Sequence, residues 1–315
     1  MKNISKKTII IVVAIIVGLF GIVEATKFAG KGSNDNNEKI TITHKLGETE
    51  VTKNPKRVVV FDYGVLDSLD ALGINVVGVP KDGIPSYLDK YSSDQYISVG
   101  GIKEPNFEKV HEAKPDLIII SGRQEESYDE FSKIAPTIYL GIENESYMES
   151  FTNNMNTLGQ IFDKEGEINK KLQGINSKIA ELNKKTSESQ KNGLIILAND
   201  GSFSVYGKES RFGIIHQNFG VAPVDSDIES STHGQKASFE YLVEKNPDYL
   251  FVVDRSAVTG GQISAKALLD NELVKSTNAY KNNNIVYLDA NVWYIATGGI
   301  NTTLTMIEEI EQAFK

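Results

Sequence analysis

Arginine is the residue type in this chain whose placement points most directly to chemistry. Of the 33 basic residues only four are arginines, at positions 57, 123, 211 and 255. An arginine side chain is always charged and presents a planar fork of N–H donors, so it suits fixed recognition of anionic oxygen atoms. Ordinary loop ion pairs remain an alternative for Arg123 and Arg255, because Glu125 and Asp254 lie near them in sequence.

Two of these arginines end a stretch that the chain contains twice. The first copy, FEKVHEAKPDLIIISGR, runs from Phe107 to Arg123, and the second, FEYLVEKNPDYLFVVDR, runs from Phe239 to Arg255. Phe, two Glu, Pro-Asp and the final Arg fall in register at a constant offset. The spacing between the copies is much too long for a solenoid repeat. We therefore expect two similar lobes within one molecule.

Each copy predicts a short helix followed by a buried strand. Apolar residues recur at helical spacing at its start, and a proline at position 115 or 247 ends the helix. An unbroken apolar run follows, at 117–120 and 249–253, as in a strand buried on both faces of a parallel sheet. The final arginines come at the carboxyl ends of these strands, where open α/β sheets bind ligands. This symmetry favours a shared cleft over loop ion pairs.

The other candidates for chemistry lie in the second half of the chain. Arg211 follows a short polar turn, His233 lies in the polar loop STHGQ, and Tyr294 follows the predicted strand 285–288. Taken singly, His233 is typical of a solvated loop and Tyr294 of core packing at a strand end. The remaining histidines, which we expect to be structural, are His44, His111 and His216.

The elements around these residues predict an α/β protein in two lobes. Strand and helix patterns alternate over residues 40–144, beginning with a hairpin that turns at Gly47, and indicate an N-terminal lobe. Residues 145–190 carry apolar stripes at helical spacing. We interpret them as linking helices rather than as a coiled-coil partner. A second α/β lobe over 191–315 closes with an amphipathic helix.

The amino terminus is typical of an export signal or a membrane anchor. Residues 1–25 combine three lysines, an apolar run over 9–23 and a small-residue cleavage site near Ala25. Residues 26–39 are polar and predict a flexible tether. Both readings place the rest of the chain on the outer side of the cell membrane.

Composition narrows the function classes. The net charge of −9 argues against a nucleic-acid surface, so any anion-binding site has to be local. The absence of cysteine excludes disulfides, thiolate metal sites and a cysteine nucleophile. The chain contains no G-x-S-x-G, P-loop or G-x-G-x-x-G motif, so we expect no enzyme activity.

Five segments together carry a resemblance to a known family. The chain resembles the substrate-binding proteins of iron–siderophore importers of the ATP-binding-cassette (ABC) type, and more narrowly their catecholate members, including petrobactin binders. The similarity covers about residues 40–315. It rests on the segments NPKRVVVFDYGVLDSLDALG, EPNFEKVHEAKPDLIIISGRQ, FSKIAPTIYLG, STHGQKASFEYLVEKNPDYLFVVDR and IVYLDANVWY.

The resemblance implies a class III periplasmic-binding-protein fold, with two Rossmann-like lobes of parallel-rich sheets joined by one long α-helix. It implies capture of a ferric catecholate siderophore in the cleft and delivery to a two-subunit ABC permease with its ATPase, without an intrinsic cofactor.

Arg123, Arg211 and Arg255 match the family's arginine triad. A ferric tris-catecholate centre carries a charge of about −3, which three fixed cations offset. His233 and Tyr294 match residues that bind Fe(III) directly when the siderophore leaves two positions open.

Two further expectations concern the cell surface. Glu108 and Glu240, which recur at the repeat offset, match the family's permease-docking pair, although exposed glutamates are usually only a solvated helix face. The chain departs from relatives in single-membrane bacteria because it has no cysteine to carry a lipid. The protein is therefore held by an uncleaved N-terminal helix, or released after cleavage.

The sequence also allows ligands other than a catecholate siderophore. Haem, a corrinoid or a hydroxamate siderophore would suit the same fold. Direct capture of zinc or manganese would need several histidines and carboxylates that converge, and the sequence offers a single candidate cleft histidine, His233.

Overall fold

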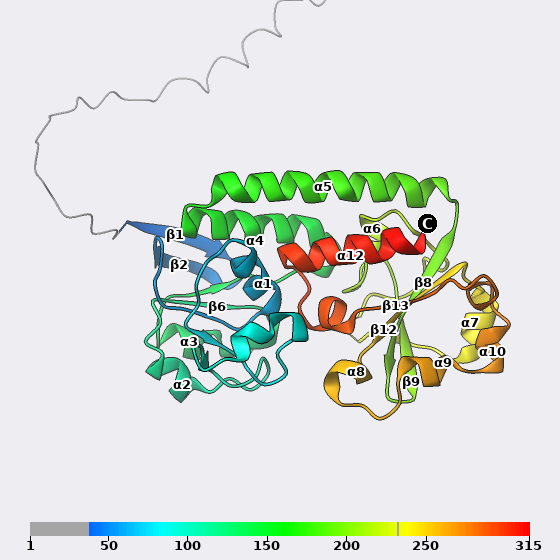
Figure 1. Cartoon of the computed structure of the whole chain (residues 1–315), viewed down its shortest axis with the longest axis horizontal. Coiled ribbons are helices and arrows are strands. Elements are labelled where there is room, and N and C mark those ends of the chain that lie inside the picture. The colour runs from blue at the N-terminus through cyan, green and yellow to red at the C-terminus, as the bar shows by residue number, and fades with distance from the viewer. Residues whose placement is uncertain (1–37, 232) are drawn as a thin grey trace, which may run out of the picture. The chain divides into compact units, whose positions relative to one another are not determined.

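The computed structural model describes residues 38–231 and 233–315, which fall within one compact unit (Figure 1). The predicted signal or anchor over 1–25 and nearly all of the tether lie outside the described residues. Within the described part, no helix is both long and apolar enough to cross a membrane.

The N-terminal lobe is built on an all-parallel sheet. An antiparallel hairpin of β1 (Lys39–His44) and β2 (Gly47–Thr52) precedes it, and the hairpin turns at Lys45–Leu46 rather than at Gly47. The sheet runs in the order β5 (Ile97–Ser98), β4 (Gly78–Val79), β3 (Val58–Val60), β6 (Leu117–Ile120), β7 (Thr137–Tyr139). Its helical segments are α1 (Tyr63–Ala71), η1 (Ser86–Ser92), α2 (Phe107–Glu112), η2 (Gly122–Ser127), α3 (Tyr128–Ser132) and η3 (Asn144–Ser146).

The C-terminal lobe has a mixed sheet whose central strands are parallel. It runs in the order β11 (Gln235–Lys236), β9 (Ser202–Tyr206), β8 (Asn192–Asn199), β12 (Tyr249–Asp254), β13 (Ile285–Leu288), and β10 (Ala222–Pro223) pairs with the start of β8. Its short helices are α6 (Ile214–Gln217), α7 (Phe239–Lys245), α8 (Ser256–Thr259), α9 (Ala265–Leu269), α10 (Glu272–Lys275), α11 (Asn278–Lys281) and the π-helical turn η4 (Asn291–Ile295). The predicted class of two α/β lobes with parallel-rich sheets is confirmed.

Two helices link the lobes. α4 (Tyr147–Phe162) packs against α5 (Glu165–Glu188), and α5 leads into β8. The heptad-spaced apolar residues of α5 are all buried, namely Ile168, Leu172, Ile175, Ile179 and Leu182. In Figure 1, α5 runs along one side of both lobes. Its buried stripe therefore makes it a packed connector rather than a free coiled-coil partner.

The C-terminal helix α12 (Ile300–Ala313) returns to the N-terminal lobe. It packs against α1 as well as against α5. The buried carboxylate of Asp67, in α1, accepts hydrogen bonds from the backbone N–H groups of Asn301 (2.7 Å) and Thr302 (3.3 Å). A helix begins with N–H groups that have no partner of their own, so this side chain from another helix caps α12. A Cβ on Gly64 would collide with the Thr297 carbonyl, which shows how closely α1 approaches this segment.

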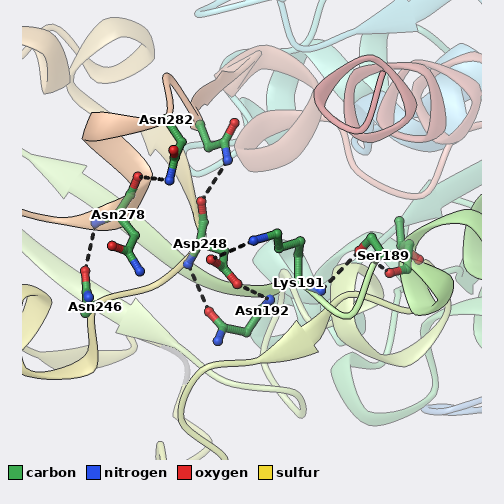
Figure 2. A network of polar contacts seen from close by, with 9 residues as sticks. Ser189, Lys191, Asn192, Asn246, Asp248, Asn278 and Asn282 are labelled. Atoms are coloured by element: carbon green, nitrogen blue, oxygen red, sulfur yellow. Dashed lines mark hydrogen bonds and ion pairs between the residues drawn. The ribbon is translucent and has the colours of Figure 1, made fainter.

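The repeated Pro-Asp pair has a structural role in both lobes. Asp116 accepts hydrogen bonds from the backbone N–H groups of Lys56 (2.7 Å) and Arg57 (2.8 Å), just before β3. Asp248, its counterpart, accepts from the backbone of Asn192 at the start of β8 (3.3 Å) and lies in the polar network of Figure 2. Each aspartate therefore fastens the amino ends of neighbouring strands, while the arginine of the same repeat stands at the opposite edge of the sheet.

The cap on α12 yields a stability prediction. Burial raises the pKa of Asp67, against the hydrogen bonds from Asn301 and Thr302 that lower it. We expect Asp67→Ala to lower the free energy of unfolding by about 1–3 kcal/mol, since it leaves buried N–H donors of α12 without an acceptor. Urea unfolding followed by circular dichroism measures the change. Asp94→Ala, at an exposed position, is the control, and equal effects of the two substitutions would contradict the capping role.

Candidate ligand-binding cleft

Two of the four arginines stand at the strand ends of the repeat, and a third joins them at the cleft. Arg123 lies in η2 directly after β6, and Arg255 follows β12. Arg211 lies in the turn between β9 and α6. All three are partly buried and line the cleft. Arg57 has a different role, because its guanidinium donates to the backbone carbonyl groups of residues 113 and 114 at the end of α2.

The three cleft arginines converge on one residue, Tyr294. Arg123 and Arg211 each donate a hydrogen bond to its backbone carbonyl, both at 2.9 Å. Arg255 donates from Nε to the phenol oxygen at 2.8 Å and holds the side chain of Asn199. The guanidinium of Arg211 also lies 4.4 Å from the centre of the Tyr294 ring. The structure thus brings together the arginines of both lobes and adds a contact that the sequence did not reveal.

Tyr294 is held in place by a π-helical turn. Its neighbour Trp293 is fully buried and donates from the indole nitrogen to Glu309, on α12, at 2.6 Å. The same carboxylate accepts the backbone N–H of Asp289 at 3.0 Å. Glu309 therefore holds the segment directly before Tyr294 at two points, Asp289 and Trp293. Single π-helical turns are frequent at functional sites.

The cleft has two compartments that share Arg211. The larger, of about 490 Å³, lies against the C-terminal lobe. The described residues that line it include no carboxylate and are Lys103, Leu197, Asn199, Ser202, Phe203, Ser204, Tyr206, Arg211, His233, Lys236, Arg255 and Tyr294. The smaller, of about 330 Å³, is lined mainly by the N-terminal lobe and includes Arg123. The larger compartment is a place where a strongly anionic ligand meets only cationic and neutral groups.

His233 lies in the larger compartment together with Tyr294. It is exposed, so its ring is open to solvent. Lys103 and Lys236 line the same compartment and were missed by the sequence analysis. Neither lysine belongs to a motif, and lysine makes up most of the basic residues, so composition gave no signal for them.

The electrostatics of the cleft favour a bound anion. Burial, together with the nearby charge of Arg123, lowers the pKa of Arg211, although a guanidinium stays protonated at neutral pH. Holding these like charges together in a partly buried cleft is costly, and an anionic ligand would relieve that cost.

The surroundings of Tyr294 lower the pKa of its phenol. Burial alone would raise its pKa, but the hydrogen bond from Arg255 and the charges of Arg255, Arg211 and Lys103 outweigh it and lower the pKa of Tyr294. Burial instead raises the pKa of Tyr206, in the same compartment, to about 12. A phenolate is a hard oxygen ligand that suits Fe(III), so the arrangement can supply one ligand atom to iron. Among residues 38–231 and 233–315, no three His, Asp or Glu side chains are grouped to hold a metal ion by themselves.

The two repeated glutamates lie away from this cleft. Glu108 and Glu240 are exposed in the first turns of α2 and α7, one helix in each lobe. Neither lines the two compartments. The structure therefore places them on comparable surface elements of the two lobes, where a partner could reach them.

Comparison with known proteins identifies relatives of the whole chain. The model of the periplasmic binding protein family matches residues 58–292. The petrobactin-binding protein YclQ of Bacillus subtilis is 48% identical over the full length of both chains. Its crystal structure superposes with a TM-score of 0.87 and 51% identity, covering 88% of this chain and 99% of that one. The catecholate-siderophore binding protein VctP of Vibrio cholerae gives a TM-score of 0.83 and 40% identity, covering 87% of this chain and 100% of that one.

The Tyr294 environment yields a prediction on pH. Because the pKa of Tyr294 is lowered while burial raises that of several other tyrosines, Tyr294 should form tyrosinate at a lower pH than they do. We expect Arg255→Ala to move this first step to higher pH, since it removes the donor and the nearest charge. Ultraviolet difference titration against Tyr294→Phe isolates the step. An unchanged titration in Arg255→Ala would show that the arginine does not set this pKa.

Proposed function

The chain belongs to the periplasmic binding protein family, and on that premise we propose that it captures a ferric catecholate siderophore in the inter-lobe cleft and delivers it to an ABC permease for iron uptake. The single observation that carries the proposal is the convergence of Arg123, Arg211 and Arg255 around Tyr294, beside a compartment without carboxylates.

The charge and shape of this site match the proposed ligand class. A ferric tris-catecholate centre, at about −3, balances three arginines, whose donor forks suit its oxygen atoms. Two relatives are named or described as binding proteins for petrobactin and for catecholate siderophores, which supports the same class. A petrobactin-like chelate is therefore the ligand that we propose first.

His233 and Tyr294 have a second role in this proposal. When the chelate leaves two iron positions open, the phenolate of Tyr294 and the imidazole of His233 complete the coordination of the Fe(III) cargo. Their position in one compartment and the lowered pKa of Tyr294 support this role. Because the phenol of Tyr294 must lose its proton to bind iron, affinity for such a chelate should fall in acid.

We place the protein at the extracytoplasmic face of the cell membrane, consistent with its family. It acts there as a non-catalytic receptor, held by its uncleaved N-terminal helix or released after cleavage near Ala25. Its partners are the ferric chelate and a two-subunit permease with an ATPase. Glu108 and Glu240 are the residues that we assign to permease docking.

A fluorescence titration tests the ligand and the arginines together. Trp293 is the only tryptophan and adjoins Tyr294, so a chelate in the cleft should quench it. We expect submicromolar quenching by ferric catecholate but not by ferric hydroxamate or haem. Arg123→Ala and Arg255→Ala should each weaken binding by about 1.5–3 kcal/mol, the usual contribution of a hydrogen bond to a charged group.

Lys133→Ala is the control for this titration, because it removes one positive charge at an exposed position outside the cleft. Wild-type affinity in both arginine variants would overturn the triad. Quenching by haem or hydroxamate in place of catecholate would keep the receptor and change its ligand.

The repeated glutamates generate a separate prediction. We expect each lobe to present one acidic side chain to a permease subunit. The double variant Glu108→Ala and Glu240→Ala should then bind the chelate normally and yet lose most iron uptake, because these exposed charges guide docking to the permease and take no part in binding the chelate. Cells in which this protein is the sole receptor, given radiolabelled iron chelate, provide the measurement. Normal uptake would assign both residues to a solvated helix face. Glu112→Ala, on the exposed surface of the same α2, is the matched control.

A further inference from the structure

The smaller compartment of the cleft has no role in the function proposed above. It holds about 330 Å³ and adjoins the larger compartment at Arg211, which lines both. A chelate that lies over the arginines could therefore extend an arm into it. The charge and polarity of the lining residues indicate which kind of arm would bind there.

Among the described residues that line it, Asp62 is the one with an acidic side chain. Its carboxylate accepts the backbone N–H of Val65 at 2.9 Å and the hydroxyl of Ser121 at 2.7 Å, one bond to each oxygen. A carboxylate oxygen can accept two hydrogen bonds, so each has an acceptor position left for a ligand. Within the described residues, Asp62 takes part in no salt bridge.

The bond to Val65 makes Asp62 the N-cap of α1, which is a structural role that needs no ligand. Asparagine and serine cap helices about as well as aspartate does, so capping alone requires no negative charge. The negative charge of Asp62 therefore matters only for a ligand group that enters the compartment. Asp62→Asn keeps the cap on α1 and removes the charge, so it separates the two roles.

The local charge of the smaller compartment favours a cation at Asp62. A chelate of about −3 is matched to the three arginines, and Lys103 and Lys236 line only the larger compartment, so neither lysine offsets the charge of Asp62 in the smaller one. Val65, Leu140 and Ile142 supply apolar walls in the same compartment. Methylene groups pack on such walls while a charged end reaches a polar group beyond them.

We propose that the smaller compartment binds an alkylammonium arm of the chelate, with the methylenes against Val65, Leu140 and Ile142 and the ammonium hydrogen-bonded to Asp62. The inference rests on the proposed function, because the arm has to be carried by the chelate. It makes Asp62 a specificity-determining residue that selects amine-bearing catecholates from those with plain alkyl arms.

Two probes of matched length test this selection. They are the ferric complexes of the aminopentyl amide and of the hexyl amide of dihydroxybenzoic acid, in which each arm ends in an ammonium group or in a methyl group. We expect the full-length protein to bind the aminopentyl complex roughly tenfold more tightly, as for a charge-assisted hydrogen bond in a partly exposed site. In Asp62→Asn the ratio of the two affinities should fall to about one.

Glu143→Gln is the matched control, because Glu143 is exposed, adjoins Asn144 of the lining and does not itself line the compartment. This variant should keep the wild-type ratio. Thermal unfolding checks that Asp62→Asn folds, and the wild-type ratio tests the proposal without any variant. Equal wild-type affinities, or a preference that survives in Asp62→Asn, would overturn the inference and leave the receptor function standing. Failure of both probes to bind would overturn the proposed function and this inference with it.

Discussion

The cleft depends on one arrangement of like charges around a single tyrosine. Three guanidinium groups from two lobes meet at Tyr294, two at its backbone carbonyl and one at its phenol. Cations repel one another in a partly buried site, and the depressed pKa of Arg211 reflects both burial and that repulsion. The carbonyl, the phenol and the aromatic ring offset part of the cost. The rest of the repulsion among the three guanidinium groups is not offset, and a bound anionic chelate would offset it.

The rest of the fold keeps this meeting point in place. Tyr294 belongs by sequence to the C-terminal lobe, yet Arg123 of the other lobe binds its carbonyl. The helix α12 that follows is capped by Asp67 of α1, and its Glu309 holds the turn around Tyr294. The segment is thus fixed from both lobes, while α5 joins them along one side (Figure 1). Large hinge motion would break several of these contacts at once, so the lobes are suited to act as a rigid pair.

The duplication distributes structural and ligand-facing tasks along one short stretch. In each copy the aspartate ties the amino ends of strands, as Figure 2 shows for Asp248, and the arginine stands at their carboxyl ends. The glutamate in the helix stays exposed. A stretch that performs the same tasks in two lobes gives the cleft one arginine from each side. Arg211 has no such counterpart, which fits its different position between the two compartments.

The sequence by itself determined the class of fold and the strand ends at which Arg123 and Arg255 stand. Burial on both faces of a strand and the stripe of α5 are local patterns, and the repeat identified equivalent positions in two lobes. The roles of His233 and Tyr294 came from family resemblance and stay proposals. Only the tertiary structure revealed that Arg123 bonds a backbone group 171 residues away, that Glu309 holds Trp293, and that Asp62 faces a separate compartment. A local pattern reports how one element is buried, whereas these contacts depend on which elements the fold brings together, and a lysine such as Lys103 has the same sequence signature in a cleft as on any surface.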